Sequence, residues 1–231
     1  MDNLPDVKMD PKETAPAGSA RKAAKKSGYR PTQQNRSAAS EKKLVEAAEM
    51  LFARHGYTHT KVSEIIRESG VSTGTFYHRF SDKEGLLVVM MQRFVAQASA
   101  MIAKWGQTTG QHETLHALLT SLAEIVFDTI TDRLGVYRAM QEVAQTIPDY
   151  WQAFGTLGQD LTRHTRAALE SHRAEITVAD LDAATTHAVQ VMLLLIIQTR
   201  LGAGIMFPKT RDAFVPIVVQ AGLGILQPKE T

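Results

Sequence analysis

Cysteine is absent from this chain of 231 residues, which excludes disulfide bonds and thiolate metal sites. Long apolar runs are absent as well. The longest, Val191 to Ile197, is far shorter than the roughly 20 residues that span a bilayer. The first twenty residues lack the apolar core of a secretory signal. We therefore expect a cytoplasmic protein without a membrane-spanning segment.

Catalytic and cofactor signatures are also scarce. No P-loop or GxGxxG motif occurs, and a thiol nucleophile is impossible without cysteine. His112 and His116 have the four-residue spacing of a zinc-binding helix, but no third ligand follows at a fixed spacing. We expect no enzyme activity, no metal site and no cofactor.

Positive charge is concentrated near the N-terminus. Residues 21–83 hold thirteen Lys and Arg against six Asp and Glu, whereas residues 84–231 hold eleven against fourteen. A basic N-terminal part on a slightly acidic body suggests that this end meets phosphate groups. The alternative is a charge run that only solvates a tail.

Residues 1–36 contain few large apolar side chains and three prolines before residue 20. Such a segment cannot bury enough surface to offset its chain entropy, so we predict a disordered tail. The tail either contacts DNA or only improves solubility. Its acid-free basic arm consists of Arg21, Lys22, Lys25, Lys26, Arg30 and Arg36.

Residues 37–84 are predicted to form a three-helix helix-turn-helix domain, in which the third helix enters the major groove. The first helix begins at an N-cap, Ser40, and ends at Gly56. Thr60 is expected to cap the second helix, and Gly70 forms the turn. Ser72 caps the third helix, whose buried side carries the four-spaced pair Phe76 and Phe80.

The outward side of the third helix carries hydroxyls, a glycine and polar aromatic groups, and we also place Arg79 there. Ser81 and Glu84 have the spacing of a capping box for a long helix that reaches about Trp105. Lys83 at its start is expected to bind phosphate. The predicted DNA-binding residues are Thr60, Lys61, Ser72, Thr73, Gly74, Thr75, Tyr77, His78 and Lys83.

Residues 40–105 resemble the DNA-binding domain of the TetR family of transcriptional repressors. The resemblance departs from the family pattern at Ile66 and Ser69, where alanines are usual, and these departures could shift how the two short helices pack. The matching residues are Ala47, Phe52, Gly56, Thr60, Ile65, Gly70-Val71-Ser72, Gly74-Thr75-Phe76-Tyr77, Phe80, Lys83, Glu84 and Leu86.

Residues 85–231 are predicted to be a helical body without strands, because nothing alternates with period two. Further helices are expected from Leu115, over 134–146, from Pro148, over 178–204 with a start at Thr177 and Asp180, and over 212–226. The apolar run that begins at Ala188 must be covered on most sides. The resemblance implies a homodimer that pairs the last two helices; a monomeric core is the alternative.

The resemblance also implies a small-molecule effector that binds in the body and moves the long fourth helix. Most side chains that could line such a cavity are apolar, which indicates a mainly apolar ligand. The candidate ligand-binding residues are Trp105, Phe127, Tyr137, Met140, Trp151, Phe154, His187 and Met192.

Together these features predict an all-α, homodimeric DNA-binding regulator, a repressor that a ligand releases from a palindromic operator. The alternative is a DNA-binding regulator without a small-molecule effector, controlled by a protein partner or acting architecturally. A helical enzyme that carries the motif by accident is the rival from another class.

Overall fold

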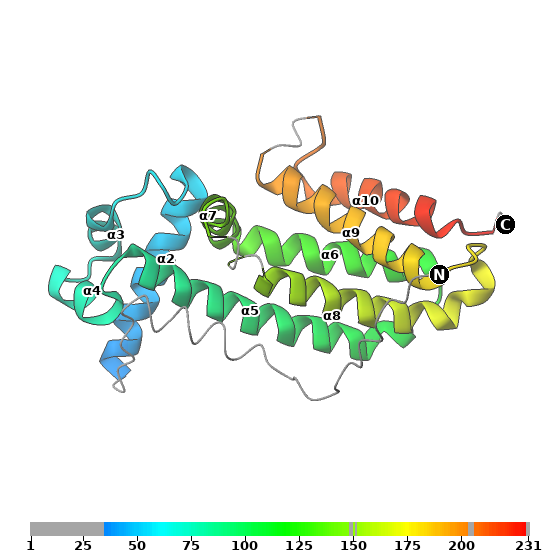
Figure 1. Ribbon diagram of the computed structural model, residues 1–231, viewed down its shortest axis with the longest axis horizontal. Coiled ribbons are helices and arrows are strands. Elements are labelled where there is room, and N and C mark those ends of the chain that lie inside the picture. The colour runs from blue at the N-terminus through cyan, green and yellow to red at the C-terminus, as the bar shows by residue number, and fades with distance from the viewer. Residues whose placement is uncertain (1–34, 148–149, 151, 203–205, 230–231) are drawn as a thin grey trace, which may run out of the picture.

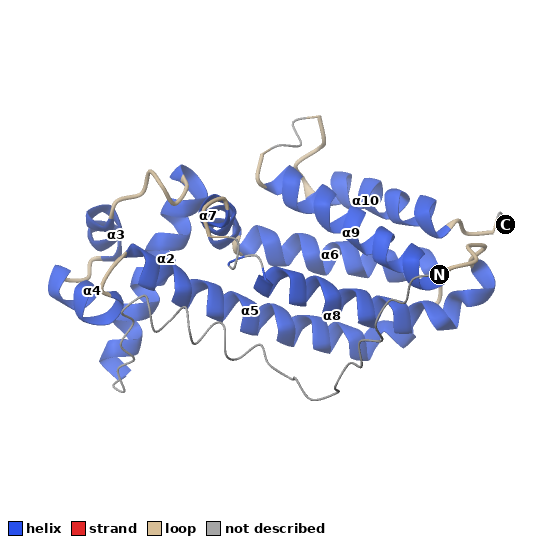
Figure 2. Cartoon of the chain, in the orientation of Figure 1, coloured by secondary structure: helices blue, strands red, loops and turns tan. Residues whose placement is uncertain are grey.

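The computed structural model describes residues 35–147, 150, 152–202 and 206–229. The described chain is helical without a strand, apart from one isolated bridge between Ile176 and Pro228 (Figure 2). The all-α prediction is confirmed. The helices are α2 (Asn35–His55), α3 (Val62–Ser69), α4 (Thr73–Phe80), α5 (Lys83–Thr108), α6 (Leu115–Asp132), α7 (Leu134–Ala144), α8 (Gln152–Leu169), α9 (Leu181–Arg200) and α10 (Arg211–Leu226), with short 3-10 turns at Thr109–Gln111 and Glu170–Glu175.

Two parts follow one another along the molecule (Figure 1). Helices α2, α3 and α4 form a head, and α5 runs from the head along the body formed by α6 to α10. Within the body, α5 packs on α8, α8 on α9, and α10 on both α9 and α6. One continuous apolar core therefore runs through both parts.

Four predicted helix starts are wrong, three of them at helices other than α3. Helix α2 begins at Asn35, so Ser40 lies inside the helix and residues 35–36 are helical. Alanines 38 and 39 favour this extension because alanine is the strongest helix former. The rest of the predicted tail lies outside the described residues. Helix α9 begins at Leu181, and its cap is Asp180 alone, since Thr177 instead donates to the Gln227 carbonyl.

The third wrong start is the capping box of α5. The N-cap is Asp82, whose carboxylate accepts from the Gly85 amide at 2.6 Å, and Ser81 has a positive φ of 62°. The Glu84 carboxylate accepts a hydrogen bond from the Tyr150 hydroxyl at 3.0 Å. The start of α5 is therefore tied to the body.

The head and the body are joined chiefly where α2 packs against α7. The Glu49 carboxylate accepts from the backbone N–H groups of Gly135 at 2.6 Å and Val136 at 3.3 Å, at the positive end of the α7 dipole. Burial nevertheless raises the pKa of Glu49 above its usual value. A Cβ on Gly135 would lie 2.1 Å from the Glu49 carbonyl oxygen, so glycine permits this close approach.

Among the described residues, two helical segments are long and apolar enough to cross a membrane by length and composition alone, Lys83–Gln111 and Leu181–Arg200. Both are elements of the helical bundle, and each buries part of its surface against neighbouring helices. Core helices of helical domains meet the same criterion.

Candidate DNA-binding site and body pocket

The turn between α3 and α4 has the geometry of a helix-turn-helix. Gly70 adopts the left-handed conformation, with φ 64°, and its N–H donates to the Arg67 carbonyl. The Ser69 hydroxyl donates to the Ile66 carbonyl and accepts from the Val71 N–H. The unusual serine therefore supports the turn, and Ile66 packs partly buried against the core.

Helix α4 begins as predicted. The Ser72 hydroxyl accepts from the Thr75 N–H at 3.3 Å and lies 2.9 Å from the Thr75 hydroxyl. Phe76 and Phe80 are fully buried, with ring centroids 5.6 Å apart, and hold the helix on the head core. The helix therefore presents its opposite side to solvent.

Four predicted DNA contacts lie together on that exposed side: Thr73, Gly74, Tyr77 and His78. Tyr77 is half exposed and rests edge-on against Phe76, which fixes its ring without burying the hydroxyl. Ser72 is also exposed, and Thr75 is partly buried beside it. We name the exposed surface formed by Ser72, Thr73, Gly74, Tyr77 and His78 the reading face.

Two predicted DNA contacts have structural roles. Thr60 is only 1% exposed, and its hydroxyl donates to the Gly56 carbonyl at 2.7 Å, so this side chain cannot reach DNA. Lys61, rather than Thr60, stands at the N-cap of α3; its side chain is exposed, and its N–H donates to Glu64. The prediction that Thr60 caps α3 and contacts DNA is wrong.

Lys83 is the other such residue. Its ammonium donates to the carbonyl oxygens of Tyr57 at 2.7 Å and Thr60 at 2.9 Å, and lies 4.2 Å from the Tyr57 ring centroid. Burial lowers its pKa. Two of its three donors are thus committed to the loop before α3, and the lysine holds that loop on the start of α5.

Arg79 is not on the outward side, contrary to the sequence-based expectation. Its side chain is 2% exposed and forms an ion pair with Glu41 of α2, which also pairs with Arg93 of α5. This ion-pair triad joins the end of α4 to both helices behind it. In the sequence, Arg79 lies at the margin of the buried stripe, one position before Phe80. The hydrophobic pattern alone therefore did not show that its side chain is buried.

Two short patterns match catalytic motifs but lack their structural context. Residues 70–74 read GVSTG and fit GxSxG, yet Ser72 caps a helix that follows another helix rather than a strand. Residues 112–116 read HETLH and fit HExxH, but His112 precedes α6 and its Nε2 lies 3.0 Å from the Ser121 hydroxyl. Among the described residues, no group of three metal-binding side chains is assembled.

The body contains a pocket of about 600 Å³, including the solvent at its mouth. Among the predicted ligand-binding residues, Tyr137 and Phe154 line it. The other lining residues come from α5, α6, α8 and α9: Phe94, Ala98, Met101, Ile102, Ile125, Val126, Thr129, Ile130, Leu157, Gly158, Leu161, Leu193 and Ile197.

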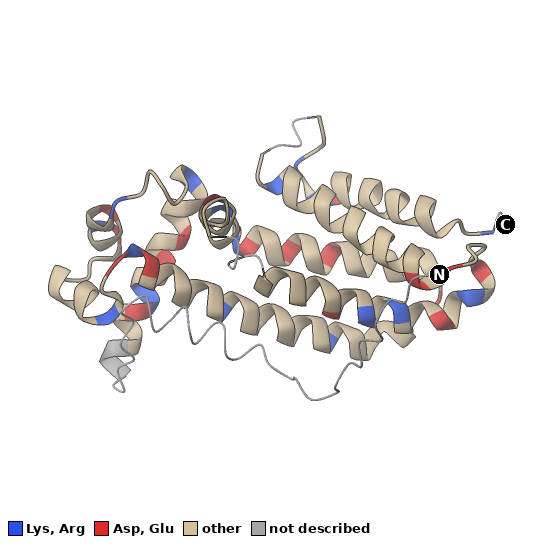
Figure 3. Cartoon of the chain, viewed as in Figure 1, with Lys and Arg blue, Asp and Glu red and all other residues tan. Residues whose placement is uncertain are grey.

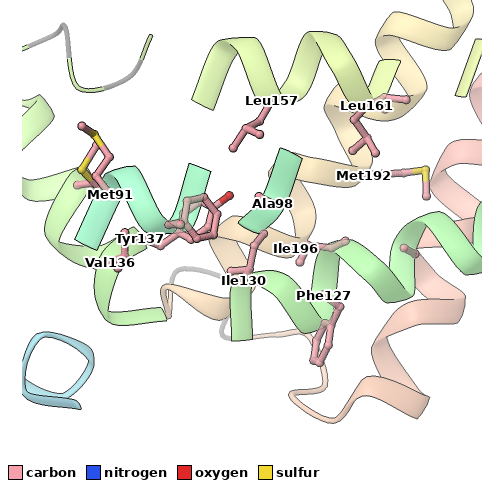
Figure 4. Close-up of a cluster of buried hydrophobic side chains, with 14 of the residues drawn as sticks. Met91, Ala98, Phe127, Ile130, Val136, Tyr137, Leu157, Leu161, Met192 and Ile196 are labelled. Carbon is pink, nitrogen blue, oxygen red and sulfur yellow. The ribbon is translucent and has the colours of Figure 1, made fainter. Parts of the chain in front are cut away.

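The remaining candidates do not line this pocket. Trp105 donates its indole N–H to Ser121 at 3.0 Å, and Phe127 packs against Phe214 on the side of α10 (Figure 4). Met140 and Met192 are buried core residues. His187 is exposed on α9, and Trp151 lies outside the described residues. The sequence identified these side chains by their aromatic, imidazole or sulfur groups, which do not show which of them border empty space.

The fold and this site define a helix-turn-helix regulator with a separate helical body. Residues 44–90 match the family model of "Bacterial regulatory proteins, tetR family". The chain is similar to the HTH-type transcriptional regulator EthR of Mycobacterium tuberculosis, with 23% identity over 56% of this chain and 60% of EthR. It is also similar to the transcriptional repressor AcnR of Corynebacterium diphtheriae, with 33% identity over 27% of this chain and 33% of AcnR.

A solved TetR-family regulator structure from Mesorhizobium loti has the same fold, with a TM-score of 0.64 and 20% identity over 84% of this chain and 98% of the other. The chain spans less than two thirds of the length of the curated relatives that it matches first. Its DNA-binding domain belongs to the TetR family of transcriptional regulators.

Proposed function

We propose that the chain is a repressor that binds a specific DNA sequence through the reading face of α4. The observation that carries this proposal is the exposed side of a short, firmly anchored helix that follows a Gly70 turn. Hydroxyl, imidazole and phenol groups on this face can donate or accept hydrogen bonds at base edges or phosphates. Gly74 adds a position where the DNA backbone can approach closely, since nothing lies within 4 Å of the point that a Cβ on this residue would occupy.

We propose that the chain acts as a homodimer through α9 and α10. These helices carry four charged residues between them, all near their ends (Figure 3). Leu194 is 49% exposed and Ile217 38% exposed, on helices that pack against each other. A two-fold axis there would present two reading faces to half-sites about 34–36 Å apart, which predicts a palindromic operator.

A small, mainly apolar molecule in the body pocket would release the repressor. The pocket favours this over the alternative of a regulator without an effector, which calls for a filled core. The pocket also lies where a ligand would reach α7: Tyr137 borders the pocket, and the N-terminus of the same helix is held by Glu49 of α2. Displacement of α7 would therefore act on the head.

Selection of bound sequences from a random duplex library tests the DNA-binding proposal. The expected result is an inverted repeat that is protected in a footprint and released by a pocket ligand. Recovery of sequences without two-fold symmetry would contradict the dimeric arrangement, and recovery of no preferred sequence would contradict specific recognition.

A further inference from the structure

The described lining of the body pocket carries no charge and only two polar side chains, Thr129 and Tyr137. The Thr129 hydroxyl already donates to the Ile125 carbonyl at 2.6 Å, within its own helix. The Tyr137 hydroxyl makes no hydrogen bond to any described residue. In Figure 4 its oxygen lies on the side of Ala98 and Leu157, which both border the pocket. Tyr137 therefore holds the one uncommitted hydrogen-bond donor among the described lining side chains.

The Tyr137 ring is held in place by two aromatic neighbours. Its centroid lies 5.1 Å from that of Phe94, edge to face, and 4.8 Å from that of Phe154. The ring is 6% exposed, and burial raises the pKa of its hydroxyl well above the usual value. The group thus stays a neutral phenol at physiological pH and can donate a hydrogen bond into an apolar space.

The uncharged lining of the pocket favours a bound molecule that carries no charge. An ion that binds in this pocket would lose its hydration and find no counter-charge among the lining residues. The free-energy cost of that desolvation is far larger than the gain from one hydrogen bond to a phenol. The three rings also pack against one another at centroid distances of 4.8 to 5.5 Å, instead of surrounding a space that a quaternary ammonium could fill.

We propose that the body pocket binds a neutral, mainly apolar molecule with one hydrogen-bond acceptor, such as a ketone or ester oxygen, which accepts from the Tyr137 hydroxyl. The acceptor end lies toward α7, and the apolar remainder extends between α5 and α8. As an effector site this inference rests on the proposed function, but the binding chemistry can be tested without DNA.

Four probes of similar size separate the ligand classes: acetophenone, ethylbenzene, benzoate and phenyltrimethylammonium. Calorimetric titration of the full chain should rank acetophenone first, about 3- to 10-fold tighter than ethylbenzene, the factor that one neutral hydrogen bond supplies. Tyr137→Phe should lower the affinity for acetophenone to that for ethylbenzene and leave the affinity for ethylbenzene unchanged. Tightest binding of either ion would overturn the proposal, as would an acetophenone affinity that Tyr137→Phe does not alter.

Two glycines on α8 supply a matched control for the place of binding. A Cβ at Gly158 would meet only Leu193, at 3.9 Å, so Gly158→Leu should fill the pocket and abolish acetophenone binding. Gly155 is exposed with open space around it, and Gly155→Leu should bind as the wild type does. Unchanged binding to Gly158→Leu would overturn the proposed location.

The outcomes distinguish a failure of the ligand inference from a failure of the proposed function. If acetophenone binds as predicted but does not release selected DNA, the ligand inference stands and ligand-controlled release fails. If no probe binds while DNA is still bound specifically, the ligand inference fails and the DNA-binding proposal stands.

Discussion

The guanidinium of Arg79, at the end of α4, is buried against the carboxylate of Glu41 in α2. The same carboxylate also pairs with Arg93 of α5. A residue in the helix that carries the reading face is thus fixed to two supporting helices by charge as well as by Phe76 and Phe80. The orientation of α4 depends on this arrangement being complete.

Glu41→Gln should lower the free energy of unfolding by about 3–5 kcal/mol, because it removes the buried carboxylate charge that faces Arg79. Urea denaturation followed by circular dichroism measures the loss. Glu46→Gln on the same helix is the control, since Glu46 makes only an exposed contact with Lys42 and the change should cost less than about 1 kcal/mol. Equal midpoints for the two variants would contradict a structural role for the triad.

Two glycines inside helices should respond oppositely to the same substitution. Gly135→Ala places a Cβ against the backbone of Glu49 and should destabilise the fold by about 1–3 kcal/mol, since α2 and α7 must separate. A Cβ at Gly158 makes only an ordinary contact with Leu193, at 3.9 Å, so Gly158→Ala should stabilise the fold by about 0.4–1 kcal/mol. Thermal unfolding of both variants gives the comparison, and a stabilising Gly135→Ala would show that the head and body do not pack this closely.

Stability should fall in alkaline solution. Burial, with the nearby Glu84 and Asp82 carboxylates, raises the pKa of Tyr57 to about 12, and burial raises the pKa values of Tyr137 and Tyr150 as well. Above about pH 10 the unfolded chain releases phenolic protons that the folded protein keeps. The stabilisation is therefore complete below that pH and is lost as pH rises toward 12.

Urea midpoints at about pH 9 and pH 11 measure this loss. Tyr57→Phe removes one of the shifted groups, so the decline between the two pH values should be smaller than in the wild type. An equal decline in both proteins would mean that Tyr57 ionises normally in the fold.

Particular residues show which structural features could be predicted from the sequence alone. Turn and cap chemistry is local, so Gly56, Gly70 and Ser72 were placed correctly, and the Phe76–Phe80 spacing identified the buried side of α4. Arg79 was placed on the wrong side of α4, and the loop contacts of Lys83 were not foreseen. Their partners, Glu41 and the Tyr57 carbonyl, come from other parts of the chain.

The pocket was the least predictable feature. Tyr137 and Phe154 border it, but Phe127 and Met192 are equally apolar and pack into solid core. Periodicity indicates which side of a helix is inward, whereas an unfilled space depends on how several helices approach one another. Gly158, which leaves part of that space open, gave no signal in the sequence.

The proposed dimer predicts a charge-sensitive surface on α9. Leu194→Glu places a carboxylate at the centre of the proposed interface and should convert the dimer to monomers in analytical ultracentrifugation. Met206→Glu, at a side chain that is 93% exposed in the loop after α9, should remain dimeric. If Leu194→Glu has the wild-type sedimentation behaviour, the interface lies elsewhere or the chain is not a dimer.

The most direct test of the central claim is DNA binding by Tyr77→Ala. Tyr77 projects from the reading face, and its loss should weaken binding to a selected duplex at least about 10-fold, the effect of one good contact to DNA. Its circular dichroism and sedimentation should match the wild type, and Met206→Ala should bind as the wild type does. A folded Tyr77→Ala dimer that binds the selected duplex with unchanged affinity would contradict recognition through α4.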